Sequence, residues 1–314
     1  MRRLACVVLL IGCEAPSLAA DAALEPDARV LDARMVDDAS SVDAPLPIDA
    51  APCCVESHYA SFPMPSTVGE GLPHEARFAA MGARVEDEIT GRIWQRETDG
   101  VRRNLEESIA YCEALVLDGQ SDFHLPTRIE LVTLLELARS PTVDAALMPT
   151  EPEYHWSSSR YAARPTSAFS VYFGAGTIDL ARGANRSALA RCVARPSGEA
   201  PAPGPVLEGA LVFDAGTGLR WMRRALPASN YAEAETACAA QGMRMPTLRE
   251  LASTLHDART APAIDTSLFL EGAGLVWTRT RSTAPSERWV IDVNDGRSRP
   301  LGEAEMASAR CVMP

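Results

Sequence analysis

An internal repeat is the feature that most constrains what this chain can fold into. "HLPTRIEL" at residues 124–131 returns as "RMPTLREL" at 244–251, displaced by 120 positions. Three more pairs of stretches match, and all four occur in the same order in both halves of the chain. They are "DEITGRIWQR" (87–96) with "DAGTGLRWMR" (214–223), "WSSSR" (156–160) with "WTRTR" (277–281), and "ARCV" (190–193) with "ARCV" (309–312). Because there are two copies of roughly a hundred residues each, the repeat indicates a duplicated globular domain rather than a solenoid.

The first predicted helix of each copy begins at an asparagine. Asn104 with Glu107, and Asn230 with Glu233, have the spacing of an N-cap and an acid at N3 that reaches back to it. Gly119 is expected to close this helix in the first copy. Its buried face is predicted from apolar residues at helical spacing, namely Leu105, Ile109, Cys112 and Val116.

The repeated phrase itself predicts a second helix. Thr127 with Glu130, and Thr247 with Glu250, form capping boxes directly after an extended residue and a proline. The rest of each copy alternates or is rich in aromatic residues, and "NDG" at 294–296 is typical of a hairpin turn. The order of strand, two helices and then an antiparallel sheet predicts an α+β fold.

Cysteine positions predict the covalent links. Six of the eight cysteines remain once Cys6 leaves with an export signal and Cys13 is lipidated, and an exported chain with an even number of them suggests disulfides. The similar spacings of 80 and 73 residues select two intradomain bonds, Cys112–Cys192 and Cys238–Cys311. No CxxC pair or histidine cluster supports the alternative of zinc, so no metal site is expected. The adjacent Cys53 and Cys54 form either a strained vicinal disulfide or an interchain bond, and we favour the latter.

The N-terminus predicts a lipid anchor. Residues 1–12 combine two arginines with an apolar run too short to span a bilayer, which is typical of an export signal. The run ends in "LIGC", which resembles the bacterial lipobox, so we expect cleavage before Cys13 and attachment of a diacylglycerol there. An ordinary signal peptide is the alternative. Glu14 after Cys13 favours the outer membrane of the bacterial cell envelope.

Composition divides the remaining chain. Residues 13–55 are rich in Ala, Asp and Pro, and 14–52 carry nine acidic and two basic residues, which predicts a disordered tether. A Pro/Gly-rich linker at 197–205 then separates a first domain (56–196) from a second domain (206–314). No basic stripe indicates a nucleic-acid partner.

The ordered landmarks resemble those of the Lcl C-terminal domain family. The resemblance is carried by "TGRIWQR", "HLPTRIELVTLL", "WSSS", "FSVYF" and "RCV" over roughly 56–196, and more loosely over 206–314. It implies two tandem C-type-lectin-like domains. It also implies a binding role, since an adhesin with such a domain binds sulfated glycosaminoglycans. Because 55–200 holds fourteen arginines against twenty acidic residues, a polyanionic ligand is not favoured for the first domain.

Function is expected to be binding rather than catalysis. The related formylglycine-generating enzymes need free cysteines, calcium lectins need a carboxylate and amide cluster, and Ser157–Ser159 lack a nucleophile elbow. We therefore predict no catalytic residue and no cofactor. Five arginines on neighbouring predicted strands are candidates for an anion-binding patch, with a solvated sheet face as the alternative. They are Arg279, Arg281, Arg288, Arg297 and Arg299.

The chain is thus expected to be a lipid-anchored envelope protein with non-catalytic binding or adhesion modules for a glycan or protein ligand. The alternative is a structural envelope lipoprotein that contacts other envelope components, and an enzyme of the formylglycine-generating superfold is third.

Cys13→Ala tests the lipid anchor. Without the thiol that would carry the lipid, we expect the chain to leave the membrane pellet for the soluble fraction of the producing cell. Immunoblots of fractionated cells would detect the shift, with Cys6→Ala as the control. Undiminished membrane retention of the Cys13 variant would contradict the prediction.

Overall fold

The computed structural model describes residues 58–181 and 186–314. The predicted signal peptide, the tether, Cys13, Cys53 and Cys54 lie outside the described residues. The first copy contains β1 (Phe78–Met81), β2 (Arg84–Asp87), β3 (Arg92–Gln95), α1 (Leu105–Glu113), α2 (Arg128–Thr133), β4 (Tyr154–Tyr161), β5 (Arg164–Tyr172), β6 (Thr177–Ala181) and β7 (Val193–Ala194). The second contains β8 (Val206–Glu208), β9 (Leu211–Asp214), β10 (Leu219–Met222), β11 (Leu226–Ser229), α3 (Tyr231–Ala240), α4 (Leu248–Ser253), β12 (Leu275–Arg281), β13 (Glu287–Asp292), β14 (Arg297–Gly302), β15 (Ala307–Ala309) and β16 (Val312–Met313).

Each copy builds two sheets. A small sheet joins the opening strands to the last one, in the orders β1-β2-β3-β7 and β16-β10-β9-β8. The other sheet has the orders β4-β5-β6 and β11-β15-β12-β13-β14, and all of its strands follow the helices of their copy except β11, which precedes α3. All ladders are antiparallel except β12 with β15, which is parallel. The described chain is therefore two tandem sheet-rich units with few helices, which confirms the predicted α+β class. Over these same residues, no helix is long and apolar enough to cross a membrane.

The predicted helix starts are confirmed. Asn104, Thr127 and Thr247 each complete a capping box, and Asn230 accepts a hydrogen bond from the Glu233 amide.

The predicted end of the first helix was wrong. α1 stops at Glu113, and Val116 is exposed rather than on the buried face. Asp118 and Gly119 instead both have positive φ in a tight turn, as an Asp-Gly pair allows at little cost. The Asp118 carboxylate accepts hydrogen bonds from the Ala83 amide at 3.1 Å and from Arg84 Nε at 3.3 Å, which holds this turn against β2.

The repeated "D..TG" stretch forms the turn between the second and third strands of each small sheet. Thr90 Oγ1 donates to Asp87 Oδ2 at 2.7 Å, and Thr217 Oγ1 donates to Asp214 Oδ2 at the same distance. Asp87 and Asp214 are buried, so this local bonding satisfies their carboxylates. The glycine that follows the threonine has positive φ in both copies.

The hydroxyls after the repeated tryptophan are structural. Ser157 Oγ donates to the main chain of β5 at 2.9 Å, and Ser159 Oγ accepts from the Arg128 amide at 3.0 Å. Thr278 and Thr280 make the equivalent bonds in the second copy. The third hydroxyl thus satisfies an amide in the first turn of α2 or α4, which a helix leaves without an internal partner.

Both predicted disulfides are present, Cys112–Cys192 and Cys238–Cys311. Each ties the first helix of its copy to the segment before the last strand. All five tryptophans of the chain are buried, and they are Trp94, Trp156, Trp221, Trp277 and Trp289.

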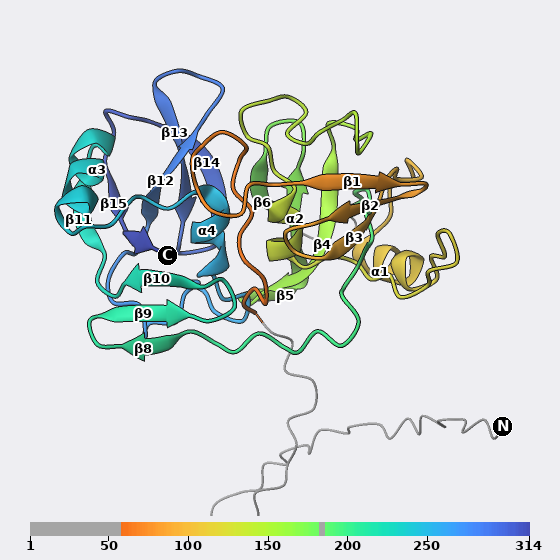
Figure 1. Ribbon diagram of the computed structural model, residues 1–314, viewed down its shortest axis with the longest axis horizontal. Coiled ribbons are helices and arrows are strands. Elements are labelled where there is room, and N and C mark those ends of the chain that lie inside the picture. The colour runs from red at the N-terminus through yellow and green to blue at the C-terminus, as the bar shows by residue number, and fades with distance from the viewer. Residues whose placement is uncertain (1–57, 182–185) are drawn as a thin grey trace, which may run out of the picture. The chain divides into compact units, whose positions relative to one another are not determined.

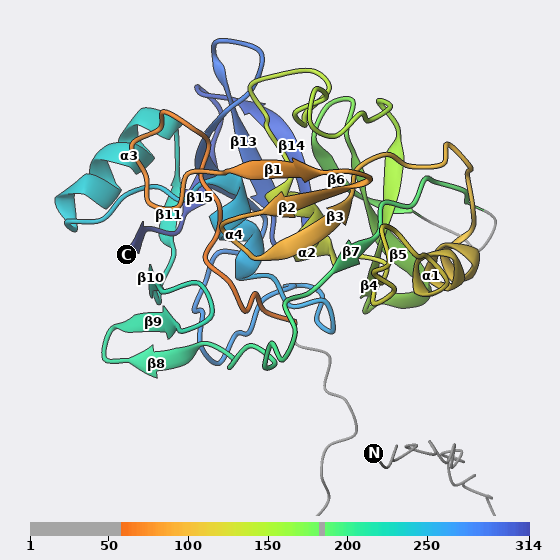
Figure 2. The ribbon, with the colours of Figure 1, turned by 45° about the vertical axis from the view of Figure 1, so that its right-hand side comes forward.

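The two copies share one hydrophobic core. Leu131 and Leu135 of the first copy lie in the same buried cluster as Leu251, Leu255 and Phe269 of the second. α2 packs against α4, and β6 lies beside β14, as the two views in Figures 1 and 2 show. Ile178 N donates to Ser298 Oγ at 2.9 Å, and these residues occupy equivalent positions of the repeat. The copies are therefore related like the halves of a twofold dimer.

Two arginines cross between the copies in opposite directions. Arg128 of α2 forms an ion pair with Asp257, and both side chains are largely buried. Arg249 of α4 donates to Glu136 Oε1 at 3.0 Å and to the carbonyl of Leu135 at 2.5 Å. Each arginine lies in the first turn of the second helix of its own copy and reaches the segment after that helix in the other copy.

Residues 58–65 run along the junction between the copies and contact both. Phe62 packs against the Arg92 guanidinium of the first copy at 3.8 Å, while Arg249 of the second copy donates to the Pro65 carbonyl at 3.0 Å. The buried Ala60 passes the β9–β10 turn so closely that a Cβ on Gly216 would lie 1.9 Å from its carbonyl oxygen.

Gly216→Ala is therefore expected to destabilise the fold by about 1–3 kcal/mol, because the added methyl must displace main chain rather than a flexible side chain. Gly204→Ala is the matched control, since its Cβ would meet Tyr59 at an ordinary 3.7 Å. Chemical denaturation of the full chain gives both free energies of unfolding. Equal stability of the two variants would contradict the close approach at Gly216.

Candidate functional site

The repeated phrase places one glutamate at the same point of each copy. Glu130 and Glu250 occupy the third position of α2 and α4, where the carboxylate accepts the amide of the capping threonine at 2.8 Å. In the first copy the Thr127 hydroxyl also donates to Glu130, at 2.9 Å. This capping fixes one oxygen of each glutamate, and the neighbours of the other oxygen differ between the copies.

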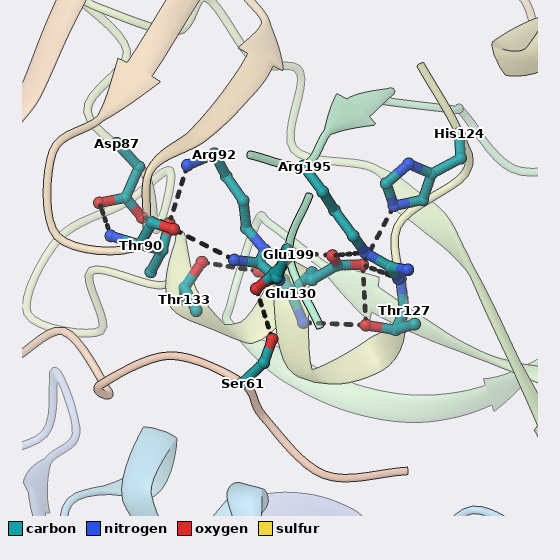
Figure 3. A network of polar contacts seen from close by, with 10 residues as sticks. All are labelled: Ser61, Asp87, Thr90, Arg92, His124, Thr127, Glu130, Thr133, Arg195 and Glu199. Atoms are coloured by element: carbon teal, nitrogen blue, oxygen red, sulfur yellow. Dashed lines mark hydrogen bonds and ion pairs between the residues drawn. The ribbon is translucent and has the colours of Figure 1, made fainter. Parts of the chain in front are cut away.

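Three basic side chains surround Glu130 in the first copy (Figure 3). Arg92 Nε lies 3.1 Å and Arg195 Nε 2.9 Å from its Oε1 oxygen, and His124 Nε2 lies 3.5 Å from Oε2. Glu130 is 1% exposed. Burial raises the pKa of this carboxyl, but the bonds and charges of His124 and Arg195 outweigh burial and hold the pKa well below the ordinary 4.5. Glu130 is therefore a carboxylate at neutral pH.

The second copy replaces this cluster with one ion pair. Arg244 stands where the first copy has His124, and it donates through both terminal nitrogens to Glu250, at 2.6 and 2.7 Å. The positions of Arg92 and Arg195 are taken by Leu219 and Pro314. Among the described residues, the multi-cation cluster thus belongs to the first copy alone.

A cavity of about 650 Å³ lies beside this cluster. Its walls come from the lead-in segment at 58–62, α2, the end of β4, and the linker at 199–202. The polar and aromatic lining includes Tyr59, Phe62, Arg92, Arg160, Tyr161 and Arg195. A concave site that mixes aromatic surface with a few convergent charged groups is typical of ligand binding.

The described residues offer little for metal or thiol chemistry. Within 58–181 and 186–314 there is no group of three or more His, Cys, Asp or Glu side chains that could hold a metal ion. The four cysteines in those ranges are all joined in disulfides.

The predicted arginine patch is partly neutralised by nearby acids. β12, β13 and β14 are neighbours as expected. Arg288 Nε lies 2.7 Å from Glu303 Oε1, and Arg297 Nη2 lies 2.7 Å from Asp295 Oδ2. Arg299 is exposed and donates to the carbonyl of Pro300 at 3.2 Å. The structure brings Arg281 opposite Arg288, and Arg279 lies two residues before Arg281 on the same strand.

The cluster around Glu130 was not predicted, because Glu130 was interpreted only as a helix-capping residue. A signal was present in the sequence. At matched positions of the repeat the first copy has Arg92, His124 and Arg195, where the second has an apolar residue, an arginine and a proline. Positions at which two copies of a duplicated domain carry different residues are candidates for a functional site, because the shared fold does not require those residues.

The family model of the Lcl C-terminal domain matches residues 83–194 and 210–313. These two matches cover more than half of the chain and coincide with the two copies. The chain therefore belongs to the Lcl C-terminal domain family, with two tandem domains, and the predicted family is confirmed. No curated protein matches the chain.

Glu130→Gln is expected to destabilise the chain by about 3 kcal/mol, because it leaves the buried Arg92 without one of its charged partners. Glu250→Gln should cost less, since its partner Arg244 keeps 21% of its side-chain surface exposed. Denaturation at pH 7 measures both losses.

The pH dependence gives an independent check. Because the folded pKa of Glu130 lies below 4.5, its contribution is present above pH 4.5 and is lost as the pH falls toward the folded pKa. The stability difference between wild type and Glu130→Gln should shrink over that range. A difference that stays constant down to pH 3 would contradict the charged state of Glu130.

Proposed function

We propose that this member of the Lcl C-terminal domain family is a lipid-anchored protein of the bacterial cell envelope, with non-catalytic binding modules for a glycan or protein ligand. The anchor is Cys13, and Glu14 favours the outer membrane. We further propose that each tandem unit has a C-type-lectin-like fold. The "LIGC" stretch after a short apolar run supports the anchor.

The observation that carries the binding function is the cavity beside Glu130. It is built from segments far apart in sequence and is lined by aromatic side chains and three arginines. The disulfide Cys112–Cys192 and the shared core support its walls, which favours a preformed site. Because Arg244 engages the equivalent glutamate of the second copy through both terminal nitrogens, binding is assigned to the first copy and support to the second.

The bonding of the candidate groups favours binding over catalysis. Glu130 accepts hydrogen bonds from its capping threonine and from two arginines, and its low pKa makes it a weak proton acceptor. The hydroxyls of Ser157 and Ser159 are engaged in structural hydrogen bonds. The described cysteines are held in disulfides.

A structural envelope lipoprotein is the second candidate. The shared core and the crossed arginines join the two copies into one compact unit. Exposed apolar side chains at Val206 and Leu207 on β8 offer a contact for another envelope component. Crosslinking in cells that captures an envelope partner through β8, with no ligand for the cavity, would favour this candidate.

Arg160→Ala tests the binding function on glycan and peptide arrays probed with the full chain. Arg160 lines the cavity and is 43% exposed, so its loss should weaken array binding about tenfold while the fold persists. Arg220→Ala, in the second copy and 35% exposed, is the control and should bind as wild type. Absence of any ligand on both arrays, or binding that Arg160→Ala leaves unchanged, would contradict the proposal.

A further inference from the structure

A carboxylate from the linker already occupies the edge of the cavity. Glu199 Oε1 accepts hydrogen bonds from Ser61 Oγ at 2.5 Å and from Arg92 Nη2 at 3.2 Å, and Glu199 Oε2 lies 3.3 Å from the same nitrogen. Figure 3 shows Glu199 and Glu130 both beside the Arg92 guanidinium. One buried arginine thus joins the fixed glutamate of the helix to an acid carried by the linker.

The receptor side of this contact is built into the fold. Arg92 is 2% exposed, packs its guanidinium on the Phe62 ring at 3.8 Å, and donates through Nη1 to the Thr90 carbonyl at 3.2 Å. Its Nε is bound to Glu130 at 3.1 Å. These contacts fix Arg92 with Nη2 directed at the position of Glu199.

The linker side of the contact is an irregular and mostly exposed segment. After a turn at 197–198, residues 199–205 have no regular secondary structure, and most of them are exposed. The Glu199 side chain itself keeps 16% of its surface exposed. A segment without regular secondary structure can give way to another peptide that makes the same contacts, without unfolding a helix or strand.

The linker has the form of a bound peptide. Residues 199–202 line the cavity, and prolines at 201, 203 and 205 bias this stretch toward an extended polyproline conformation. Tyr59, Phe62 and Tyr161 line the same cavity, and a Cβ added at Gly204 would lie 3.7 Å from the Tyr59 ring. Aromatic-lined grooves are a common receptor for proline-rich extended peptides.

The charge of the Arg92 guanidinium indicates which kind of group can replace Glu199 of the linker. Without Glu199, Arg92 Nη2 would lose its carboxylate partner at a place that is nearly closed to water. A buried charged donor that loses its acceptor is strongly disfavoured, so the vacated site selects another carboxylate. Ser61 supplies a second donor for it.

We propose that the cavity beside Glu130 is a receptor for an aspartate or glutamate on an extended, proline-containing peptide of a partner protein, and that the linker occupies this receptor until such a peptide displaces it. This inference rests on the proposed binding function and specifies its ligand as an acidic peptide rather than a glycan.

The test uses a fluorescent peptide with the sequence of the linker, Gly-Glu-Ala-Pro-Ala-Pro-Gly, titrated into the full chain. Glu199→Gln weakens the internal occupant, so this variant should bind the peptide about tenfold more tightly than wild type. Glu208→Gln is the matched control, because this acid pairs with Arg220 at 2.9 Å on β10, and it should bind as wild type. A twin peptide with Gln for Glu should show no gain on the Glu199 variant.

Two further measurements separate displacement from a general loosening of the chain. Hydrogen exchange at the linker amides of wild type should rise when the acidic peptide binds, since the linker is displaced. Adding Ser61→Ala to Glu199→Gln should reduce the gain in affinity, because Ser61 donates to the bound carboxylate.

Three outcomes would overturn the inference. One is equal binding of the acidic and amide peptides, and another is an affinity that Glu199→Gln leaves unchanged. The third is tighter binding of an oligogalacturonate than of the peptide to the Glu199 variant, which would assign the carboxylate site to a glycan. If neither peptide binds but an array ligand still depends on Arg160, this inference fails while the binding function stands.

Discussion

A buried guanidinium beside the last cysteine ties together distant segments of each copy. Arg191 donates through Nη1 to the carbonyls of Gln95 and Arg96, and through Nη2 to the carbonyl of Pro149 and the hydroxyl of Thr150, at 2.6–3.0 Å. Arg310 bonds four main-chain carbonyls in the same way in the second copy, those of Met222, Arg223, Leu270 and Glu271. Burial lowers the pKa of both groups to about 10, so both stay charged at neutral pH. Each arginine thus supplies donors both to the end of the third strand and to the long loop after the second helix of its copy.

These bonds, which we call the arginine clamp, account for the occurrence of "ARCV" in both copies. The clamp also positions the segments that form the site. The arginine fixes the end of β3 and the loop before β4, while the adjacent cysteine fixes α1. Arg92 begins β3, and Arg195 follows β7, which pairs with β3. The two cations that meet at Glu130 are therefore positioned by a strand pair that the clamp and the disulfide hold in place.

Features set by neighbouring residues could be predicted from the sequence. The capping boxes at Thr127 and Thr247, the hairpin at 294–296 and the two disulfides depend on short spacings or on the symmetry of the repeat. The end of α1 was mispredicted because Val116 fits a helical period, whereas the positive φ values of Asp118 and Gly119 and the bond from Ala83 decide the local structure. The roles of Arg191 and Arg128 and the cations around Glu130 could not be assigned, because they depend on partners far away in the chain. The shared core was also not predicted, because the Pro/Gly-rich linker at 197–205 indicated two separate domains.

The copies differ in how they satisfy one carboxylate, and this difference separates scaffold from site. A glutamate at the third helical position offers two oxygens, and capping engages one of them. In the second copy Arg244, in the loop between α3 and α4, pairs with the carboxylate through both terminal nitrogens and leaves no need for further cations. In the first copy His124 is shorter, so Arg92 and Arg195 approach from other segments, and Arg92 keeps a nitrogen for a second acid. Because the shared core and the crossed arginines give the first copy support from its neighbour, one wall of its cavity can be an irregular linker rather than a strand.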